Sequence, residues 1–229
     1  MSRTRQESHG FRGQRVFWLL VLGLSHGPGI HGQTETQRNS PSSWAHLRLE
    51  EIDTSSSGNP GFEERLERIR AMYVLAADEG DWLERAKDSL TALQPSIPKG
   101  SKEEVAFEAY RGALEVVRAK HSRWPPNKLK YLGNGAEILD DLVARHPDNL
   151  EVRYLRLASY IFLPSFLRRD DSLAADLGTL TTGLPDQPGA FSPPVYKAVL
   201  QFVLENGALD REQRVQLERA LQGELQHNG

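Results

Sequence analysis

A helical stripe followed by proline occurs three times along this chain of 229 residues. In each copy, apolar or small residues stand at positions 0, +4 and +7, and a proline stands at +12. The first three positions share one face of a helix, and the proline ends the helix and directs the chain into the next one. The spacing is therefore typical of repeated helical hairpins. The copies are Ala86-Leu90-Leu93-Pro98, Gly135-Leu139-Leu142-Pro147 and Leu173-Leu177-Leu180-Pro185.

From Phe62 to the C-terminus the pattern is helical, and no run has the alternation of a strand. The sequence predicts an all-α fold of stacked antiparallel hairpins, as an α-α superhelix or a compact helical bundle. Helices are expected over residues 62–78, 127–145, 170–181, 192–205 and 210–225, with others beginning near 81, 101 and 148.

Polar residues at helix starts give these boundaries. Ser101 and Asp210 are each followed three residues later by Glu or Gln, which is the spacing of a capping box. Asp148 is the expected N-cap of the helix after Pro147. Gly112 lies inside a helix, where glycine costs about 1 kcal/mol, and so predicts a close neighbouring backbone.

The N-terminal residues have the layout of a secretory signal peptide. Arg12 and Arg15 precede a nine-residue apolar run, residues 16–24, which is too short to span a bilayer. Gly32 would be the last residue removed, so 1–32 is expected to be a signal peptide and the protein to be exported. No integral membrane span is expected after its cleavage.

Residues 33–60 are rich in Ser, Thr, Gln, Asn, Pro and Gly and are expected to be a flexible spacer. Within them, Trp44 to Leu49 alternates enough to dock as a short strand or extended segment. The all-α domain is expected to cover residues 61–229.

Composition excludes several classes of function. The chain has no cysteine, which removes disulfides, thiolate metal sites and a cysteine nucleophile. Residues 1–32 carry four arginines and one glutamate, so their removal takes the formal charge from −3 to −6. An acidic mature protein is a poor candidate for nucleic-acid binding.

Stripes at positions 0, 3, 4 and 7 also occur, at Ile69-Met72-Tyr73-Ala76 and Tyr154-Leu157-Ala158-Ile161. Together with the three copies that end in proline, they resemble the stripes of tetratricopeptide-like helical repeats. In that family the first helix of a hairpin has stripe positions at 0, 3, 4 and 7, and the second has them at 0, 4 and 7 with proline at +12. The copies here are 49 and 38 residues apart, which departs from the shorter fixed period of the family. The segment from Tyr110 to Leu167 also resembles uncharacterised exported bacterial proteins of similar length.

Chemical motifs are sparse. No His-x-x-x-His pair and no Asp-rich calcium loop occurs, so no metal site and no cofactor is predicted. One helix face stands out, because Arg153, Arg156 and Tyr160 lie at positions 0, 3 and 7. The guanidinium group of arginine can donate two parallel hydrogen bonds to a carboxylate, so this face is a candidate site for an acidic peptide or another anionic ligand.

A structural alternative exists for the same face. Arg153 and Arg156 would pair with Glu137, Asp140 or Asp141 on the preceding antiparallel helix, and this alternative is favoured because helices joined by a short turn pack together.

These observations predict an exported, non-catalytic helical-repeat protein of the bacterial periplasm or exterior that binds a protein or peptide partner as a scaffold. The competing interpretation is a periplasmic enzyme or small-ligand-binding protein whose site forms only in three dimensions.

Overall fold

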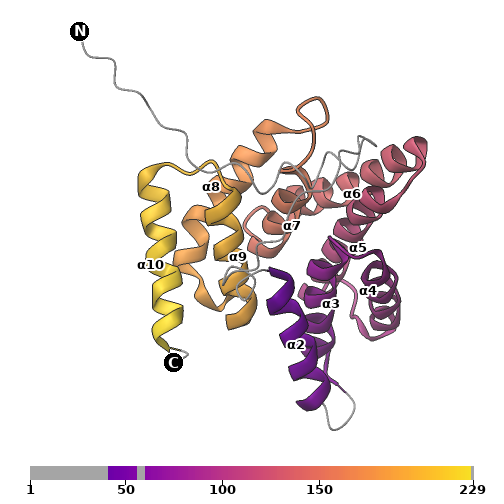
Figure 1. Ribbon diagram of the computed structural model, residues 1–229, viewed down its shortest axis with the longest axis horizontal. Helices are drawn as coiled ribbons and strands as arrows, with labels where there is room; N and C mark the ends of the chain where they lie inside the picture. Colours follow the sequence, from indigo (N-terminus) through magenta and orange to yellow (C-terminus); the bar gives the residue numbers. More distant parts are fainter. Residues whose placement is uncertain (1–40, 56–59, 228–229) are drawn as a thin grey trace, which may run out of the picture.

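The structure is a computed structural model that describes residues 41–55 and 60–227. These residues form nine α-helices and no strand, which confirms the predicted all-α class (Figure 1). Two short 3-10 helices lie between them, η3 (Gln94–Ser96) and η4 (Pro188–Ala190). The α-helices are α2 (Pro41–Ser55), α3 (Phe62–Ala76), α4 (Gly80–Leu93), α5 (Lys102–His121), α6 (Pro125–Arg145), α7 (Leu150–Tyr160), α8 (Asp170–Asp186), α9 (Pro193–Asn206) and α10 (Arg211–His227).

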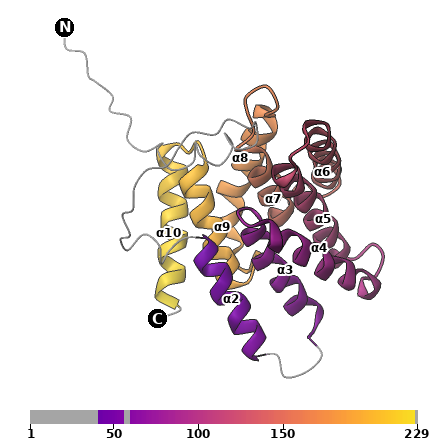
Figure 2. The same cartoon turned by 45° about the vertical axis from the view of Figure 1, so that its right-hand side comes forward.

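The helices from α3 onward pack as consecutive hairpins, as the stripes predict. α3 packs on α4, α5 on α6, α7 on α8, and α9 on α10, while α5 also contacts α3, α4 and α7 (Figure 1, Figure 2). One apolar core runs from α2 to α7, and a second joins α7 to α10. α7 contributes to both cores, so it connects the two halves of the molecule.

The expected spacer is wrong for residues 41–55, which form helix α2. Ala45, Leu49 and Ile52 stand at positions 0, 4 and 7 and are buried, so one face of α2 is apolar. α2 packs against α3 and also reaches α9. The short strand or extended segment expected over residues 44–49 is also wrong, because these residues lie within α2, where Leu47 is 65% exposed while Ala45 and Leu49 are buried.

Polar contacts fix α2 along α3. Asp53 forms an ion pair with Arg68 at 2.5 Å, and Arg48 lies 3.4 Å from the buried carboxylate of Glu67. The expected signal peptide, residues 1–32, lies outside the described residues, as do 33–40 and 56–59.

The recurring prolines act differently at the three sites. Pro98 and Pro147 follow the ends of α4 and α6, as expected. Pro185 instead lies inside α8, which extends to Asp186 rather than ending at residue 181. A proline in the last turn removes one backbone hydrogen bond while the helix ends one residue later, so the helix tolerates it.

Two expected caps are present and one is displaced. The Ser101 hydroxyl accepts from the Glu104 amide at 3.2 Å, and Asp210 and Gln213 cap α10 reciprocally at 2.9 and 3.0 Å. The cap expected at Asp148 is wrong. Asn149 caps α7 by accepting from the Val152 amide at 3.0 Å, because a cap side chain reaches the amide three residues further on.

The close backbone neighbour predicted for Gly112 is confirmed. A Cβ on Gly135 would lie 2.5 Å from the Gly112 carbonyl oxygen and 3.0 Å from the Val116 nitrogen. A Cβ on Gly112 would lie 2.9 Å from the Ile138 side chain. α5 and α6 therefore cross with their backbones in contact, which only glycine allows.

Gly135→Ala is expected to destabilise the fold by about 1–3 kcal/mol, because the added methyl meets backbone atoms that cannot move aside. Gly133→Ala, two residues earlier on the same helix, has open space and is expected to stabilise by up to about 1 kcal/mol. Denaturant midpoints of the two variants test this contrast. Equal midpoints would contradict a close crossing.

Candidate functional site

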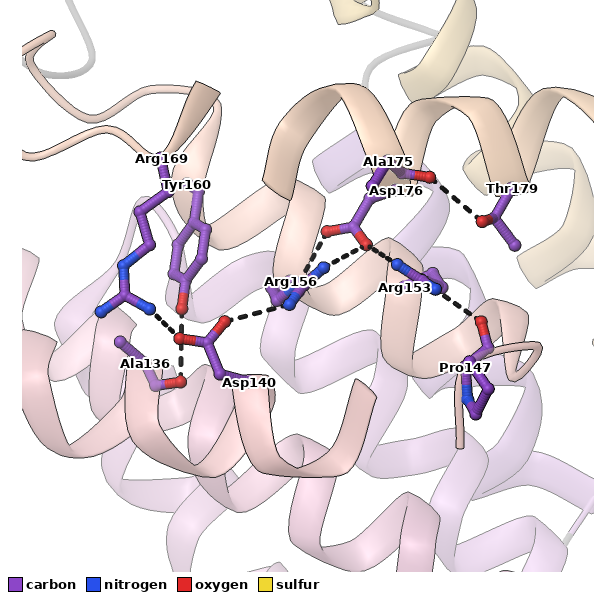
Figure 3. A network of polar contacts seen from close by, with 10 residues as sticks. All are labelled: Ala136, Asp140, Pro147, Arg153, Arg156, Tyr160, Arg169, Ala175, Asp176 and Thr179. Carbon is purple, nitrogen blue, oxygen red and sulfur yellow. Dashed lines mark hydrogen bonds and ion pairs between the residues drawn. The ribbon is translucent and has the colours of Figure 1, made fainter. Parts of the chain in front are cut away.

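Helix α7 directs Arg153 and Arg156 toward α8, onto a carboxylate that the sequence analysis did not single out. Asp176 has no exposed surface. Its two oxygens accept hydrogen bonds from Arg156 Nε and Nη2 at 2.8 and 2.7 Å, and Arg153 Nη1 donates to it at 2.8 Å (Figure 3). One buried carboxylate thus holds two guanidinium groups, one of them in bidentate geometry.

The same network continues to α6. Arg156 Nη1 donates to Asp140 at 3.0 Å, and Arg169 contacts the other oxygen of Asp140 (Figure 3). Tyr160 is buried and donates its hydroxyl proton to the Ala136 carbonyl at 3.3 Å. Burial raises the pKa of Tyr160 to about 12, although the positive charge of Arg156 opposes the shift.

This geometry supports the structural alternative for the predicted site. The expected pairing of Arg156 with Asp140 on the preceding helix is confirmed. The pairing expected for Arg153 on that helix is wrong, because Arg153 pairs with Asp176 on α8. Asp141 pairs with Arg145 instead. Because Arg153 and Arg156 are held by internal carboxylates and Tyr160 is buried, these three residues present little to a ligand outside.

The sequence contained a signal for Asp176, the carboxylate that the prediction did not include. Asp176 stands at position +3 of the stripe that begins at Leu173 and continues with Leu177 and Leu180. An acidic residue on the apolar face of a helix needs a buried partner, and the two arginines of the preceding helix provide it.

A second buried network joins α3, α5 and α7. Arg70 donates through Nε and Nη2 to the two oxygens of Glu151 at 2.7 and 2.9 Å, and through Nη1 to Glu67 at 3.1 Å. The Tyr110 hydroxyl donates to Glu151 at 2.9 Å, and Ser192 donates to Glu67. Residues from three helices and the N-cap residue of α9 thus share one set of buried charges.

The pKa values in this network follow from burial and pairing. Burial alone would lower the pKa of Arg70, but the hydrogen bond and the charge of Glu151 outweigh it and raise the pKa. Burial and then the charge of Glu151 raise the pKa of Tyr110 well above its usual value. Both groups therefore hold one protonation state across the physiological range, as is typical of a structural network.

A surface that is open to solvent and combines charged, polar and apolar side chains lies instead along the α5–α6 hairpin. A groove of 570 Å³ runs between the two helices. The Arg118 guanidinium lies over the Tyr131 ring at 4.0 Å, and Arg118 pairs with Glu115 at 3.2 Å. The lining residues are Arg111, Glu115, Arg118, Lys130, Tyr131, Asn134, Glu137 and Ile138.

The sequence contained a periodic signal for this groove. Glu108 and Arg111 form an ion pair three residues apart, and Glu115 and Arg118 repeat that pair seven residues later. The repeat places two arginines on one side of α5. Such a pattern is common on solvated helices, and only the structure places an aromatic ring from α6 beside it.

No protein-family model matches the chain, and no curated protein or solved structure is significantly similar to it. Within residues 41–55 and 60–227, none of the helices is both long enough and apolar enough to cross a bilayer. Over the same residues, no three His, Asp or Glu side chains converge as they would around a metal ion.

Asp176→Ala is expected to destabilise the protein by about 3–5 kcal/mol, because it leaves two arginine side chains in a buried site without their shared carboxylate. Asp141→Ala removes a carboxylate from an exposed ion pair with Arg145 and serves as the control, with little effect expected. Free energies of unfolding from denaturant titrations test the difference. A loss as small for Asp176→Ala as for the control would contradict a structural role.

Proposed function

We propose that this chain is an exported, non-catalytic binding module of the bacterial envelope, in which stacked hairpins hold a segment of a partner protein. The observation that carries the proposal is the groove between α5 and α6, where Arg118 covers Tyr131 at the surface. Arginine and tyrosine are enriched among the residues that contribute most to protein–protein binding.

The hairpin packing supports a tetratricopeptide-like arrangement. The first helices α3, α5 and α7 contact one another in order, and the second helices α4 and α6 each contact the next first helix. In such stacks each unit packs mainly on its neighbours and leaves continuous helical surfaces exposed. These surfaces typically bind peptides or protein segments.

Helix α2 covers one of the two surfaces that could bind a partner. It packs on α3 and reaches α9, which are first helices of two hairpins far apart in the sequence (Figure 2). α2 therefore covers part of the side that the first helices form. The groove on α5 and α6 has no such covering among the described residues, and so it is the preferred surface.

The lining of this groove suits a polypeptide. Tyr131 and Ile138 offer apolar contact, and Asn134 offers both a hydrogen-bond donor and an acceptor. Arginine side chains accompany glutamates along α5, so a partner segment with charges of both signs fits best. Export rests on the arginines and the short apolar run within residues 1–32.

Capture experiments with the immobilised full chain test this proposal. The variant Arg111→Glu/Arg118→Glu reverses two groove cations and removes the contact over Tyr131. From an envelope extract of the source organism, one protein is expected to be retained in stoichiometric amount by the parent and not by this variant.

A matched variant controls for charge and for the loss of a ring contact. Arg85 lies over Trp82 at 4.7 Å and Lys87 pairs with Glu84, both on α4 and outside the groove. Arg85→Glu/Lys87→Glu is expected to retain the partner. Equal retention by both variants, or by neither, would contradict binding at the groove.

A further inference from the structure

Large apolar side chains are exposed around the start of α6 and on the α7–α8 loop. Within the described residues, the large hydrophobic side chains classed as exposed are Leu47, Trp124, Leu129 and Phe166. Three of these four lie on the α5–α6 turn, the start of α6 and the α7–α8 loop. Trp124 is 64% exposed, Leu129 59% and Phe166 74%.

These three side chains belong to neighbouring elements. The α7–α8 loop packs on the first half of α6, because Leu163 and Leu167 join a small apolar cluster with Leu132 and Ala136. The loop and the α5–α6 hairpin project from the same side of the molecule in both views (Figure 1, Figure 2). Trp124, Leu129 and Phe166 therefore stand on segments that pack on one another, and these segments are called the edge below.

Basic residues accompany each apolar group on this edge. Arg123 precedes Trp124, lysines 128 and 130 flank Leu129, and Arg168 follows two residues after Phe166. Residues 116–136 contain no Asp or Glu, although the whole chain has a formal charge of −3. The edge thus combines exposed apolar groups with a local excess of positive charge.

Three acidic side chains near this edge are already paired, and one of them pairs with a basic residue of the edge itself. Asp170 pairs with Arg168, Asp140 with Arg156 and Arg169, and Asp78 with Lys120. Among the described residues, no carboxylate lies within ion-pair distance of Arg123 or Lys130. Positive charge at these two positions is therefore available to an external anionic surface.

The shape of the edge favours a lipid surface over a protein pocket. Trp124 and Phe166 protrude from turns, whereas anchors of protein interfaces fill pockets in well-packed centres. Two prolines follow Trp124 and restrict the backbone that presents it. Tryptophan with neighbouring Lys and Arg is the combination found where proteins lie in the headgroup region of a membrane.

We propose that this edge, comprising Arg123, Trp124, Leu129, Lys130 and Phe166, docks peripherally on a bilayer rich in anionic lipid. The apolar groups enter the headgroup boundary and the cations contact lipid phosphates. The edge shares Lys130 with the lining of the partner groove, but it does not use the arginines that the groove has on α5. A membrane-docked module would present that groove beside the bilayer.

Site-specific labelling tests the proposal, because the full chain has no cysteine of its own. Leu129→Cys and Phe166→Cys, each labelled with an environment-sensitive fluorophore, are mixed with vesicles of phosphatidylcholine and phosphatidylglycerol. Emission is expected to rise about threefold or more at both positions on anionic vesicles, and little on vesicles of phosphatidylcholine alone. Leu47→Cys on α2, which is 65% exposed, is the matched control and is expected to change little.

Charge reversal tests the electrostatic part. Arg123→Glu/Lys130→Glu in the labelled chains is expected to weaken vesicle binding about thirtyfold or more, because each cation near an anionic surface contributes roughly a factor of five. An equal rise at position 47, which would follow from attachment through the N-terminal apolar run, would overturn the proposal. Absence of any rise on anionic vesicles would also overturn it, as would an equal rise with soluble polyglutamate, which would assign the edge to an acidic protein.

Discussion

The arrangement of the hairpins depends on the buried ion pair between Arg70 and Glu151. Arg70 is only 8% exposed, and its guanidinium meets both oxygens of Glu151 at 2.7 and 2.9 Å. A guanidinium removed from water requires partners in a fixed geometry, because leaving it unpaired costs several kcal/mol. Since Arg70 is on α3 and Glu151 is in the first turn of α7, this pair sets the position of one helix relative to the other.

Buried ion pairs also fix helix α7 relative to the helices on its other side, α6 and α8. Its first turn is tied to α3 and α5 through Glu151, and its middle is tied to α6 and α8 through Arg153 and Arg156. Replacing such networks by apolar residues often leaves stability unchanged, so stability alone does not account for their presence. We infer that these charges specify how the hairpins stack.

Features that depend on local sequence were largely predictable. The helical period gave the all-α class, and the interior glycine at position 112 indicated a close crossing that the structure contains. The caps at Ser101 and Asp210 followed from the residue types and their spacing. Each of these depends on contacts within a few residues, or on a backbone that only glycine permits.

Features that depend on distant partners were not predictable. α2 was missed because its composition resembles a linker, and only packing on α3 and α9 gives its apolar face a place to bury. The partner of Arg156 was sought on the preceding helix, whereas the main carboxylate, Asp176, lies 20 residues later on α8. The groove beside Tyr131 likewise required knowing which faces of α5 and α6 stay outside.

A double-mutant cycle on Arg70→Met and Glu151→Gln tests the central claim most directly. Each single variant leaves a buried group without its partner and is expected to lower the free energy of unfolding by about 3 kcal/mol or more. The double variant is expected to lose less than the sum, with a coupling energy of about 2 kcal/mol. Losses that add to within about 0.5 kcal/mol would contradict the account, because the two residues would then stabilise the fold independently.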